Sequence, residues 1–299
     1  MNTTENIYNA SIWILITCED EREQLLPIIA RIHRERPTTP IVELHSGKEL
    51  MRAIRSLGKE EKPDRLICVA AHLNFLHRFL LKKRAIDVRY FQGDTRFDSA
   101  EATVQAARED EIAASFIGST RRVIVAGETD LQDEQMLTRY IDEHEDTKLI
   151  LIPHEPDTAH LQEIFQLTHG HQIRYTEATP INVQTNRVLV VEPTELRAGL
   201  YRYATAAYVG GGLGRGLGNA IEPAAWGKPV LFAPKYTNRP EGQILINCGG
   251  AVSIRNYDEL CGAMEEALSA HAEIGAKSRH FVVENLTNET NKIYQQLTA

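Results

Sequence analysis

Three consecutive glycines at residues 210–212 precede Asn219 and Glu222 in a pattern that suits the binding of an anion. Glycine lets the backbone approach a ligand closely, and the start of a helix offers unpaired N–H groups with partial positive charge. Asn219 and Glu222 are three residues apart, so on a helix both fall on one face, where an amide orients a ligand and a carboxylate accepts from ribose hydroxyls. The pattern predicts a nucleotide site. The same two residues also suit a helix cap and a charge at the positive helix end, and spacing alone leaves that interpretation open.

The residues around these glycines predict the elements that would position them. Residues 206–209 form an apolar run typical of a buried strand, and helical spacing of apolar side chains begins near Ile221. Gly227 is placed to end that helix, and residues 230–232 predict the next strand. The unit is therefore βαβ. It does not carry the dinucleotide fingerprint, because residues 210–218 contain no G-x-G-x-x-G in any register.

Composition limits the class of protein. The chain has 299 residues, of which 42% are hydrophobic and 25% charged, and this predicts a soluble globular protein with two domains. A net charge of −8 argues against a general nucleic-acid binder, although Lys82, Lys83 and Arg84 form a local basic patch for a membrane or a phosphate. Residues 1–16 lack a basic leader region, and their apolar run is too short to span a bilayer. Any membrane contact is therefore expected to be peripheral.

Four cysteines are widely spread along the chain. Cys18, Cys68, Cys248 and Cys261 include no C-x-x-C pair, and three of them lie in or beside apolar runs. We interpret them as reduced core thiols of a cytosolic protein.

Predicted strands and helices alternate along the chain, which indicates parallel sheets covered by helices on both faces. The expected fold is α/β, with two Rossmann-like doubly wound domains at residues 1–98 and 99–299, and ligands at the carboxyl ends of the strands. Residues 93–98, GDTRFD, have the character of a connection between the domains. The predicted strands are 11–17, 40–44, 65–70, 88–91, 122–126, 148–152, 172–175, 188–191, 206–209, 230–232 and 251–254, and the helices are 20–32, 48–57, 73–83, 133–143, 158–167, 195–203, 219–226, 257–270 and 271–297.

Five separated stretches together resemble a known family. They are GDTRFD at 93–98, AGETDLQDE at 126–134, the pair Pro153 and His154, YRYATAAYVGGG at 201–212 and GNAIEPAAWGKPVLFAP at 218–234. In this order they resemble the bacterial 3-deoxy-D-manno-octulosonic acid (Kdo) transferases, which are glycosyltransferases of the GT-B fold in lipopolysaccharide biosynthesis. The resemblance covers roughly residues 88–254.

The resemblance implies that Kdo moves from the donor CMP-Kdo to a lipid A precursor at the cytoplasmic face of the inner membrane. It implies a C-terminal domain that binds the nucleotide sugar, an N-terminal domain on the acceptor side, and no cofactor. By matching position, Pro153 and His154 would lie near the donor, Thr194, Glu195 and Leu196 would line the nucleotide, Gly211 and Gly212 would form the phosphate turn, and Asn219, Ala220, Ile221 and Glu222 would hold CMP.

The resemblance also implies a catalytic base. Residues 13–32 align without gaps on the first strand and helix of the family, and this register places Glu21 on the proposed base. A carboxylate there would accept the proton of the lipid A hydroxyl as that oxygen displaces CMP from the anomeric carbon. Glu19, Asp20 and Glu23 flank Glu21, and acids at a helix start are also typical of helix-dipole stabilisation, so both interpretations stay open.

Three departures from the family pattern affect these expectations. Gly218 stands where the family commonly has histidine, and Glu128 stands where it commonly has a small hydroxyl residue. A carboxylate beside a phosphate is electrostatically adverse, so Glu128 either points away or signals altered donor binding. By comparison with the family pattern, we expect the chain to lack much of the family's N-terminal domain between about residues 50 and 88, and to lack the family's N-terminal membrane anchor. The N-terminal domain is therefore expected to be reduced.

Two functions remain from the residues and the resemblance. The first is an inverting Kdo transferase, peripheral at the inner membrane. Its reaction is expected to be metal-independent, because no Asp-x-Asp pair is present to hold a nucleotide-bound divalent ion. The second is a shortened, non-catalytic relative that keeps a nucleotide pocket and acts as a binding or regulatory protein. Glu21 and the reduced acceptor side distinguish the two.

Overall fold

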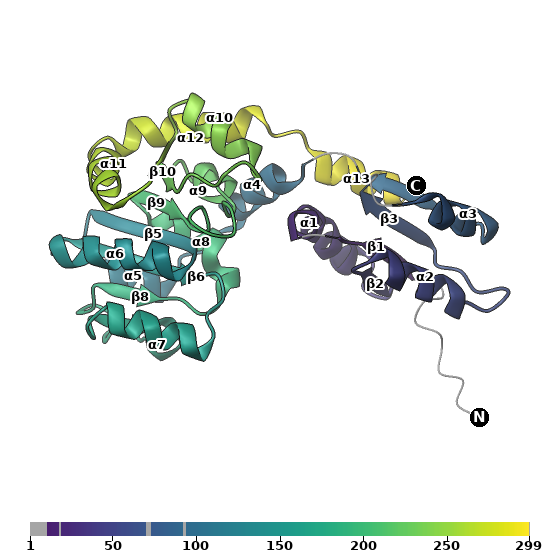
Figure 1. Ribbon diagram of the computed structural model, residues 1–299, viewed down its shortest axis with the longest axis horizontal. Helices are drawn as coiled ribbons and strands as arrows, with labels where there is room; N and C mark the ends of the chain where they lie inside the picture. Colours follow the sequence, from purple (N-terminus) through teal and green to yellow (C-terminus); the bar gives the residue numbers. More distant parts are fainter. Residues whose placement is uncertain (1–10, 18, 70–72, 92–93, 299) are drawn as a thin grey trace. The chain divides into compact units, whose positions relative to one another are not determined.

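The computed structural model describes residues 11–17, 19–69, 73–91 and 94–298, and the chain divides into two compact units (Figure 1). Unit 1 comprises Met1–Ser99 and Thr287–Ala299, and unit 2 comprises Ala100–Leu286. Cys18 and Gly93 lie outside the described residues.

Unit 1 is built on a four-stranded parallel sheet in the order β2-β1-β3-β4. The strands are β1 (Ile12–Leu15), β2 (Ile41–Leu44), β3 (Arg65–Val69) and β4 (Val88–Phe91). Strand β1 is buried on both faces, and its side chains alternate between two cores. Ile12 and Ile14 belong to one core, whereas Trp13 and Leu15 belong to the other.

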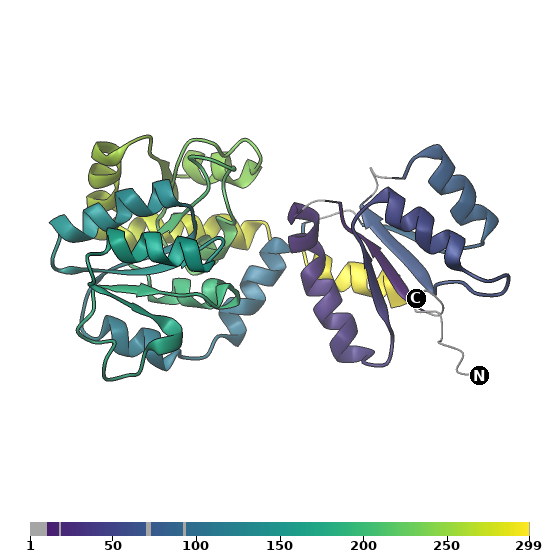
Figure 2. The ribbon, with the colours of Figure 1, turned by 60° about the horizontal axis from the view of Figure 1, so that its bottom comes forward.

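Helices cover both faces of this sheet, as Figure 2 shows. The helices of unit 1 are α1 (Glu19–Glu35), α2 (Gly47–Ser56), α3 (Phe75–Lys83) and α13 (Glu289–Thr298). Helices α1 and α13 share the core that contains Ile14, and α2 and α3 share the core that contains Trp13. Ser46 and Asn74 cap α2 and α3 by accepting from backbone N–H groups of the first turn, which fixes where both helices begin.

The C-terminal segment differs from the predicted domain boundaries. Sequence placed it with the second domain, as the end of one long helix at 271–297. In the structure that stretch forms two helices, α12 (His271–Glu284) and α13, and α13 packs in unit 1 through Ile293 and Tyr294. Helix α12 ends at its C-cap residue, Asn285. The apolar face of α13 is then buried in unit 1 and not in unit 2.

Unit 2 contains a seven-stranded sheet in the order β11-β10-β9-β5-β6-β8-β7, with all recorded pairings parallel. Its strands are β5 (Arg122–Thr129), β6 (Thr147–Pro153), β7 (Gln172–Arg174), β8 (Val188–Val190), β9 (Ala206–Val209), β10 (Val230–Phe232) and β11 (Ala251–Ser253). Along β5, Ile124 and Ala126 face one core while Val123 and Val125 face the other. Both faces of the sheet are therefore buried, as a doubly wound sheet requires.

The helices of unit 2 lie on the two sides of that sheet (Figure 1). The α-helices are α4 (Arg96–Ala106), which begins in unit 1, then α5 (Glu111–Ile117), α6 (Leu131–Glu143), α7 (Thr158–Leu167), α8 (Arg197–Leu200), α9 (Ile221–Ala225), α10 (Pro240–Asn247), α11 (Tyr257–Ser269) and α12, and the short 3-10 helices are η1 (Tyr175–Glu177), η2 (Thr194–Leu196) and η3 (Tyr201–Tyr203). Sequence did not predict α4, α5 or α10. The stretch predicted as a connection at 93–98 instead opens α4 at Arg96.

The predicted fold class is confirmed: the chain is α/β, with parallel sheets in two Rossmann-like units. The cysteine prediction is confirmed only in part, because Cys68 is buried but Cys248 is exposed at the end of α10. Strand β5 pairs with β6 on one side and β9 on the other, so the chain reverses its direction of winding between β5 and β9. In such sheets the crevice for a ligand opens at the carboxyl ends of the two strands at this reversal.

Candidate functional site

The glycine turn follows β9 at that reversal, and its glycines are needed to let backbone segments of this chain approach one another. Gly211 has a φ of 86°, and a Cβ atom there would lie 2.2 Å from the carbonyl oxygen of Gly216. A Cβ on Gly210 would lie 2.2 Å from the carbonyl oxygen of Glu128, and one on Gly212 would lie 2.5 Å from that of Ala233. The predicted turn is present, but the close approach at these glycines is made by protein backbone.

Asp133, in the first turn of α6, holds the first part of this turn. Its carboxylate accepts from the backbone N–H of Gly211 at 3.0 Å, from the Tyr208 hydroxyl at 2.6 Å and from the backbone N–H of Asp130 at 3.0 Å. The side chain is completely buried. The backbone N–H of Gly211, which was expected to bind a ligand phosphate, therefore donates to a carboxylate of the protein.

Glu128 accepts a hydrogen bond from a second backbone N–H of the predicted site, that of Asn219. Its Oε1 accepts from the backbone N–H of Asn219 at 2.8 Å and lies 3.3 Å from Nη1 of Arg197, while its Oε2 lies 3.6 Å from Nη1 of Arg215. Burial opposes a charge here, but Arg197, the Asn219 amide and Arg215 together hold the pKa of the Glu128 carboxyl below its usual value. Of the two possibilities left by sequence, Glu128 does not point away: its carboxylate lies at the start of α9.

Asn219 and Glu222 also have partners within the protein. The Asn219 side chain accepts from the backbone N–H of Ile221 at 3.1 Å, and Glu222 forms a two-bond ion pair with Arg197 at 2.8 and 2.9 Å. Asn219 is buried, and 13% of the Glu222 side chain remains exposed. Arg215, with 30% of its side chain exposed, connects this cluster to the surface. The N-cap residue of α9 is Ala220, so Asn219 lies one residue before the cap, and Glu222 pairs with Arg197 in addition to lying in the first turn of the helix.

The other predicted donor residues lie around the same end of the sheet. Pro153 is the last residue of β6 and lies beside Thr129, and His154 follows it, with its backbone N–H donating to the Thr129 carbonyl at 3.0 Å. The His154 side chain is exposed. Ala220 and Ile221 are buried at the start of α9. Thr194, Glu195 and Leu196 form η2, which leads directly into Arg197.

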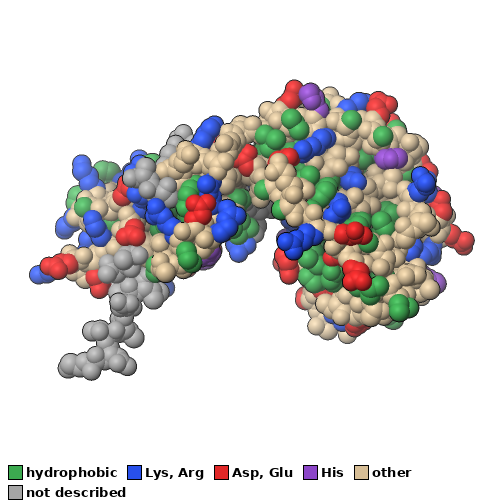
Figure 3. Space-filling view, turned by 180° about the vertical axis from the view of Figure 1, so that it is seen from behind, with side chains coloured by type: hydrophobic (Ala, Val, Ile, Leu, Met, Phe, Trp, Pro, Cys, Tyr) green, Lys and Arg blue, Asp and Glu red, His purple; other side chains and the backbone are tan. Residues whose placement is uncertain are grey.

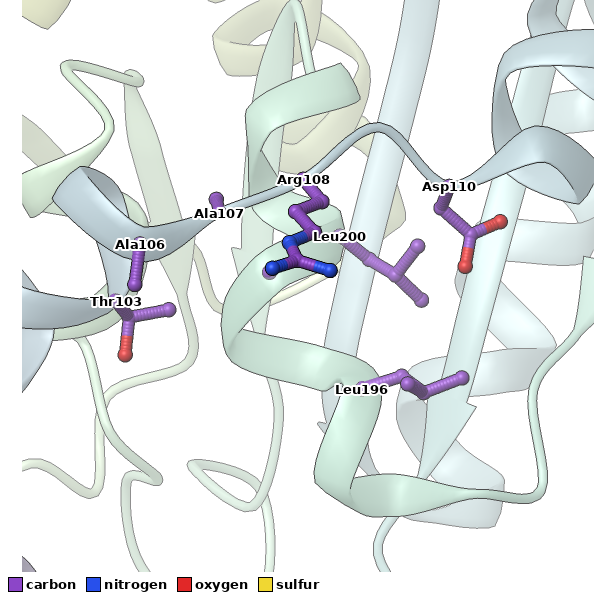
Figure 4. Close-up of a pocket in the computed structure, with 8 residues that line it drawn as sticks. Thr103, Ala106, Ala107, Arg108, Asp110, Leu196 and Leu200 are labelled. Atoms are coloured by element: carbon purple, nitrogen blue, oxygen red, sulfur yellow. The ribbon is translucent and has the colours of Figure 1, made fainter.

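Leu196 lines a pocket of about 320 Å³ within unit 2, which Figure 4 shows. Leu196 and Leu200 form one wall, and Arg108 and Asp110 come from the segment between α4 and α5. The lining also includes Thr103, Ala106, Ala107 and Gly199. The glycine turn is not part of this lining, so the structure does not bring Leu196 and Gly211 together around one described pocket.

Glu21 lies in unit 1, in the first turn of α1 at the carboxyl end of β1. Its Oε2 accepts from the backbone N–H of Thr17 at 2.6 Å and from the Thr17 hydroxyl at 2.9 Å. The Glu21 side chain is buried, with 7% exposure. These contacts fix the start of α1, and they also hold one carboxylate oxygen in a defined position.

Sequence reasoning missed the cations of the site. Arg197 comes one residue after the predicted nucleotide-lining stretch, and Arg215 lies inside the glycine-rich loop, yet neither was selected. The available signal was Glu128 itself, because an acid within an apolar strand needs cationic or N–H partners if it is buried.

A second titratable pair lies nearby in unit 2. Glu134 is completely buried, and its Oε1 accepts from the Thr129 hydroxyl at 2.8 Å. Its Oε2 lies 2.7 Å from Nε2 of His160, whose Nδ1 lies 2.9 Å from the Glu155 carbonyl. Desolvation works against the imidazolium, but the Glu155 carbonyl and the Glu134 carboxylate raise the pKa of His160 above its ordinary value.

Within residues 11–17, 19–69, 73–91 and 94–298, His, Cys, Asp and Glu side chains form no group of three or more that could hold a metal ion. In the same part of the chain, no helix has both the length and the hydrophobicity needed to cross a bilayer.

The fold and the switch-point site together define a class: proteins built from Rossmann-like units, an architecture shared by GT-B glycosyltransferases and nucleotide-sugar epimerases. The UDP-N-acetylglucosamine 2-epimerase of Neisseria meningitidis has a TM-score of 0.58 at 12% identity, covering 96% of this chain and 99% of its own. WaaG, a glycosyltransferase involved in lipopolysaccharide biosynthesis, has a TM-score of 0.57 at 10% identity, covering 96% and 100%. At such identities the likeness shows the fold alone.

The more particular similarity is to Kdo transferases. The 3-deoxy-D-manno-octulosonic acid transferase of Aquifex aeolicus is 28% identical over 163 residues, which cover 52% of this chain and 44% of that protein. The C-terminal CMP-Kdo binding domain of WaaA from Acinetobacter baumannii has a TM-score of 0.50 at 18% identity, covering 62% of this chain and 97% of that domain. No protein-family model matches the chain. The predicted resemblance to Kdo transferases is confirmed, and the match spans less than half of the curated relative.

Proposed function

We propose that this chain is a glycosyltransferase that moves Kdo from CMP-Kdo to a lipid A precursor in lipopolysaccharide biosynthesis. The observation that carries the proposal is the sequence similarity to the Aquifex aeolicus Kdo transferase. The glycine turn and the arginine-rich cluster at the carboxyl ends of β5 and β9 are compatible with it, because a nucleotide sugar is expected at that edge of a doubly wound sheet. Unit 2 would bind the donor and unit 1 would bind the acceptor.

In the proposed reaction, Glu21 is the general base. Its carboxylate would accept the proton of the acceptor hydroxyl while that oxygen forms a bond to the anomeric carbon of Kdo. The bond from that carbon to the phosphate oxygen would break, and CMP would leave with its electron pair. Direct displacement inverts the anomeric configuration and needs no covalent enzyme intermediate. Metal independence is part of the proposal, with hydrogen bonds and arginine side chains stabilising the leaving phosphate.

A second function, that of a non-catalytic relative which binds a nucleotide, is favoured by one specific observation. The amides of Gly211 and Asn219 are already occupied by the carboxylates of Asp133 and Glu128. Two protein carboxylates at the predicted phosphate turn repel the phosphate of a donor. A relative with this arrangement would bind CMP weakly and transfer no sugar.

The first prediction separates a base from a helix cap at Glu21. Glu49 provides a matched control, because its Oε2 accepts from the His45 backbone N–H at 2.6 Å, as Glu21 does from Thr17, but its side chain is only half-buried. We expect Glu21→Gln to lower kcat for Kdo transfer by about 100-fold or more, the usual scale of a lost general base. Glu49→Gln should leave kcat within about twofold.

The measurement is a transfer assay with CMP-Kdo and a lipid A precursor, together with CMP binding by calorimetry. Wild-type protein that binds CMP without transferring Kdo would support the non-catalytic relative. Absence of CMP binding would contradict both functions. Equal losses of activity in the Gln variants of Glu21 and Glu49, matched by equal losses of thermal stability, would show that Glu21 acts only as a cap.

Helix α3 supports the proposed peripheral location at the cytoplasmic face of the inner membrane. Phe75, Leu76 and Phe79 are exposed by 86%, 52% and 55%, and Lys82 and Lys83 are exposed in the last turn of the same helix. Figure 3 shows hydrophobic and basic side chains close together over the unit that carries this helix. An apolar face beside lysines suits an anionic lipid surface. Arg84 of the predicted basic patch instead donates to the carbonyls of Leu57 and Gly58.

The second prediction concerns this surface. We expect the protein to sediment with vesicles of phosphatidylethanolamine and phosphatidylglycerol, and we expect the Phe75→Ser/Phe79→Ser variant to lose about 10-fold or more in affinity. Phe165→Ser is the control, because that phenylalanine is 58% exposed on α7 of unit 2. If Phe165→Ser weakens vesicle binding as much as the α3 variant does, α3 is not the membrane surface.

A further inference from the structure

We propose that the guanidinium groups of Arg197 and Arg215 and the backbone N–H of Asn219 form a phosphate-binding site. The carboxylate of Glu128 fills this site in the present conformation. A ligand phosphate would bind there only by displacing Glu128. The inference deepens the proposed function, since that phosphate would belong to the donor, but the binding of an anion can be tested without the donor.

The contacts of Glu128 resemble those that a phosphate would make. One oxygen meets a backbone N–H at 2.8 Å and a guanidinium nitrogen at 3.3 Å, and the other oxygen faces a second guanidinium at 3.6 Å. Backbone N–H groups and arginines are also the donors that bind phosphate oxygens in proteins. Asn219 and Glu128 are 91 residues apart in sequence, so the tertiary fold assembles this set of donors.

The surrounding charge favours an anion at this position. The Glu128 side chain is 7% exposed, and burial by itself would favour the neutral acid. Arg197, the Asn219 amide, Arg215 and the more distant Arg239 outweigh burial, so the pKa of Glu128 is lowered. Glu222 and Asp130 also pair with the two arginines, at 2.8 and 3.4 Å, and they hold the guanidinium groups in place.

A glycine at position 218 leaves the space for the carboxylate, and a buried hydroxyl lies beside the residue that precedes Glu128. A Cβ at Gly218 would lie 2.6 Å from the Glu128 carboxyl carbon, so the absence of a side chain at 218 makes the space that the carboxylate occupies. The Tyr201 hydroxyl is buried beside Gly127 and the stem of Arg197, and within the described part of the chain it has no side-chain hydrogen-bond partner.

The backbone of Glu128 supports a displaceable side chain. Its φ is 55°, a left-handed conformation that is costly for a residue other than glycine. Arg215 donates to the Glu128 carbonyl at 2.6 Å, which fixes this backbone independently of the carboxylate. The Glu128 side chain can therefore leave the cluster while the loop keeps its position.

The test measures binding of inorganic phosphate, CMP and cytidine by calorimetry to the wild type and to Glu128→Ala. We expect Glu128→Ala to bind phosphate and CMP about 10-fold more tightly than the wild type does. Both proteins should bind cytidine with the same affinity, because only the charged ligands contact the donors that Glu128 leaves free. Adding Arg215→Ala to Glu128→Ala should remove the gain. Glu266→Ala is the matched control, because it deletes one exposed acid of unit 2, on α11, and changes the net charge of the protein by the same amount.

Equal phosphate affinity of the wild type and a folded Glu128→Ala overturns the inference, as does an equal gain for cytidine or in Glu266→Ala. Glu128→Gln keeps the size of the side chain and removes its charge, so if Glu128→Ala fails to fold, the Gln variant decides. A phosphate gain of about threefold in Glu128→Gln supports the inference, and no gain overturns it. The proposed function fails separately if phosphate binding is gained while CMP binds no more tightly than phosphate.

Discussion

At the scale of single residues, the pair of Glu134 and His160 ties the start of α7 to the start of α6, and Glu134 also accepts from Thr129 at the end of β5. Both imidazole nitrogens face acceptors, the Glu155 carbonyl and the Glu134 carboxylate, so the doubly protonated imidazolium satisfies both contacts. Burial raises the pKa of the Glu134 carboxyl, but once that carboxyl is ionised, a neutral ring with only one N–H must leave one of the two contacts unmade. The pair therefore links the protonation of His160 to the stability of unit 2.

The third prediction gives the sign of that link. The pKa of His160 is raised above 6.5 in the folded protein, so its contribution is fully present below the unfolded pKa and is lost as the pH rises through the folded pKa. We expect His160→Gln to lower the free energy of unfolding by about 1–2 kcal/mol at pH 6 and by less at pH 9. The measurement is urea unfolding at both pH values.

His154→Gln is the control for this prediction, because it removes a histidine whose side chain is exposed in the same segment. This variant should keep the wild-type dependence of stability on pH. A loss in His160→Gln that is the same at pH 6 and pH 9 would contradict the proposed role of the imidazolium.

At the scale of elements, the crossing of α9 and α12 depends on a glycine. A Cβ on Gly275 of α12 would lie 2.0 Å from the carbonyl oxygen of Gly227, which ends the turn after α9 with a φ of 65°. Gly262 is likewise within a helix, α11, but a Cβ there would meet nothing within 4 Å. Two helical glycines thus have opposite structural roles.

The fourth prediction compares alanine at these two positions. Gly275→Ala should destabilise unit 2 by about 3 kcal/mol or more, because the clash is with backbone that cannot move without separating the helices. Gly262→Ala should raise stability by about 0.5–1 kcal/mol through helix propensity alone. Thermal and urea unfolding measure both effects, and similar changes in the two variants would show that α12 and α9 are not held this closely.

At the scale of the whole molecule, the end of the chain completes the core of unit 1. Ile293 and Tyr294 of α13 are buried together with Ile28, Ile29 and Ile32 of α1. The guanidinium of Arg31 also lies 4.1 Å from the centre of the Tyr294 ring. Unit 1 is therefore formed from both ends of the sequence, and it depends on residues that follow all of unit 2.

The fifth prediction uses this arrangement. Ile293→Ala should destabilise unit 1 by about 2–4 kcal/mol, as expected for a buried large-to-small substitution, and leave unit 2 unchanged. Hydrogen exchange should then show lost protection in β1 and α1 and normal protection in β5 and β9. Ile244→Ala, at a position that is 47% exposed on α10, is the control and should have little effect. Loss of protection in both units after Ile293→Ala would indicate that they unfold together.

The sequence by itself determined the fold class and the main elements. Short apolar runs that end in glycine, such as 206–209, indicated buried strands, and helical spacing identified helices such as α6 and α7, because both signals are local. The glycines at 210–212 were correctly assigned to a turn. The helical signal in the sequence was weaker for α4, because its charged first turn, with Arg96 and Asp98, is also typical of a loop that connects two domains.

Only the tertiary structure decided what those local features contact. Glycine is required at 210–212 because other backbone segments approach there, and sequence could not distinguish that reason from the approach of a ligand. The partners of Glu128 come from Arg197, Arg215 and Asn219, which are far from it in sequence and near it in space. Pairing of buried charges is a long-range property, since burial and cationic neighbours arise only when separate segments pack together. For the same physical reason, α13 could not be assigned to unit 1 from its own residues.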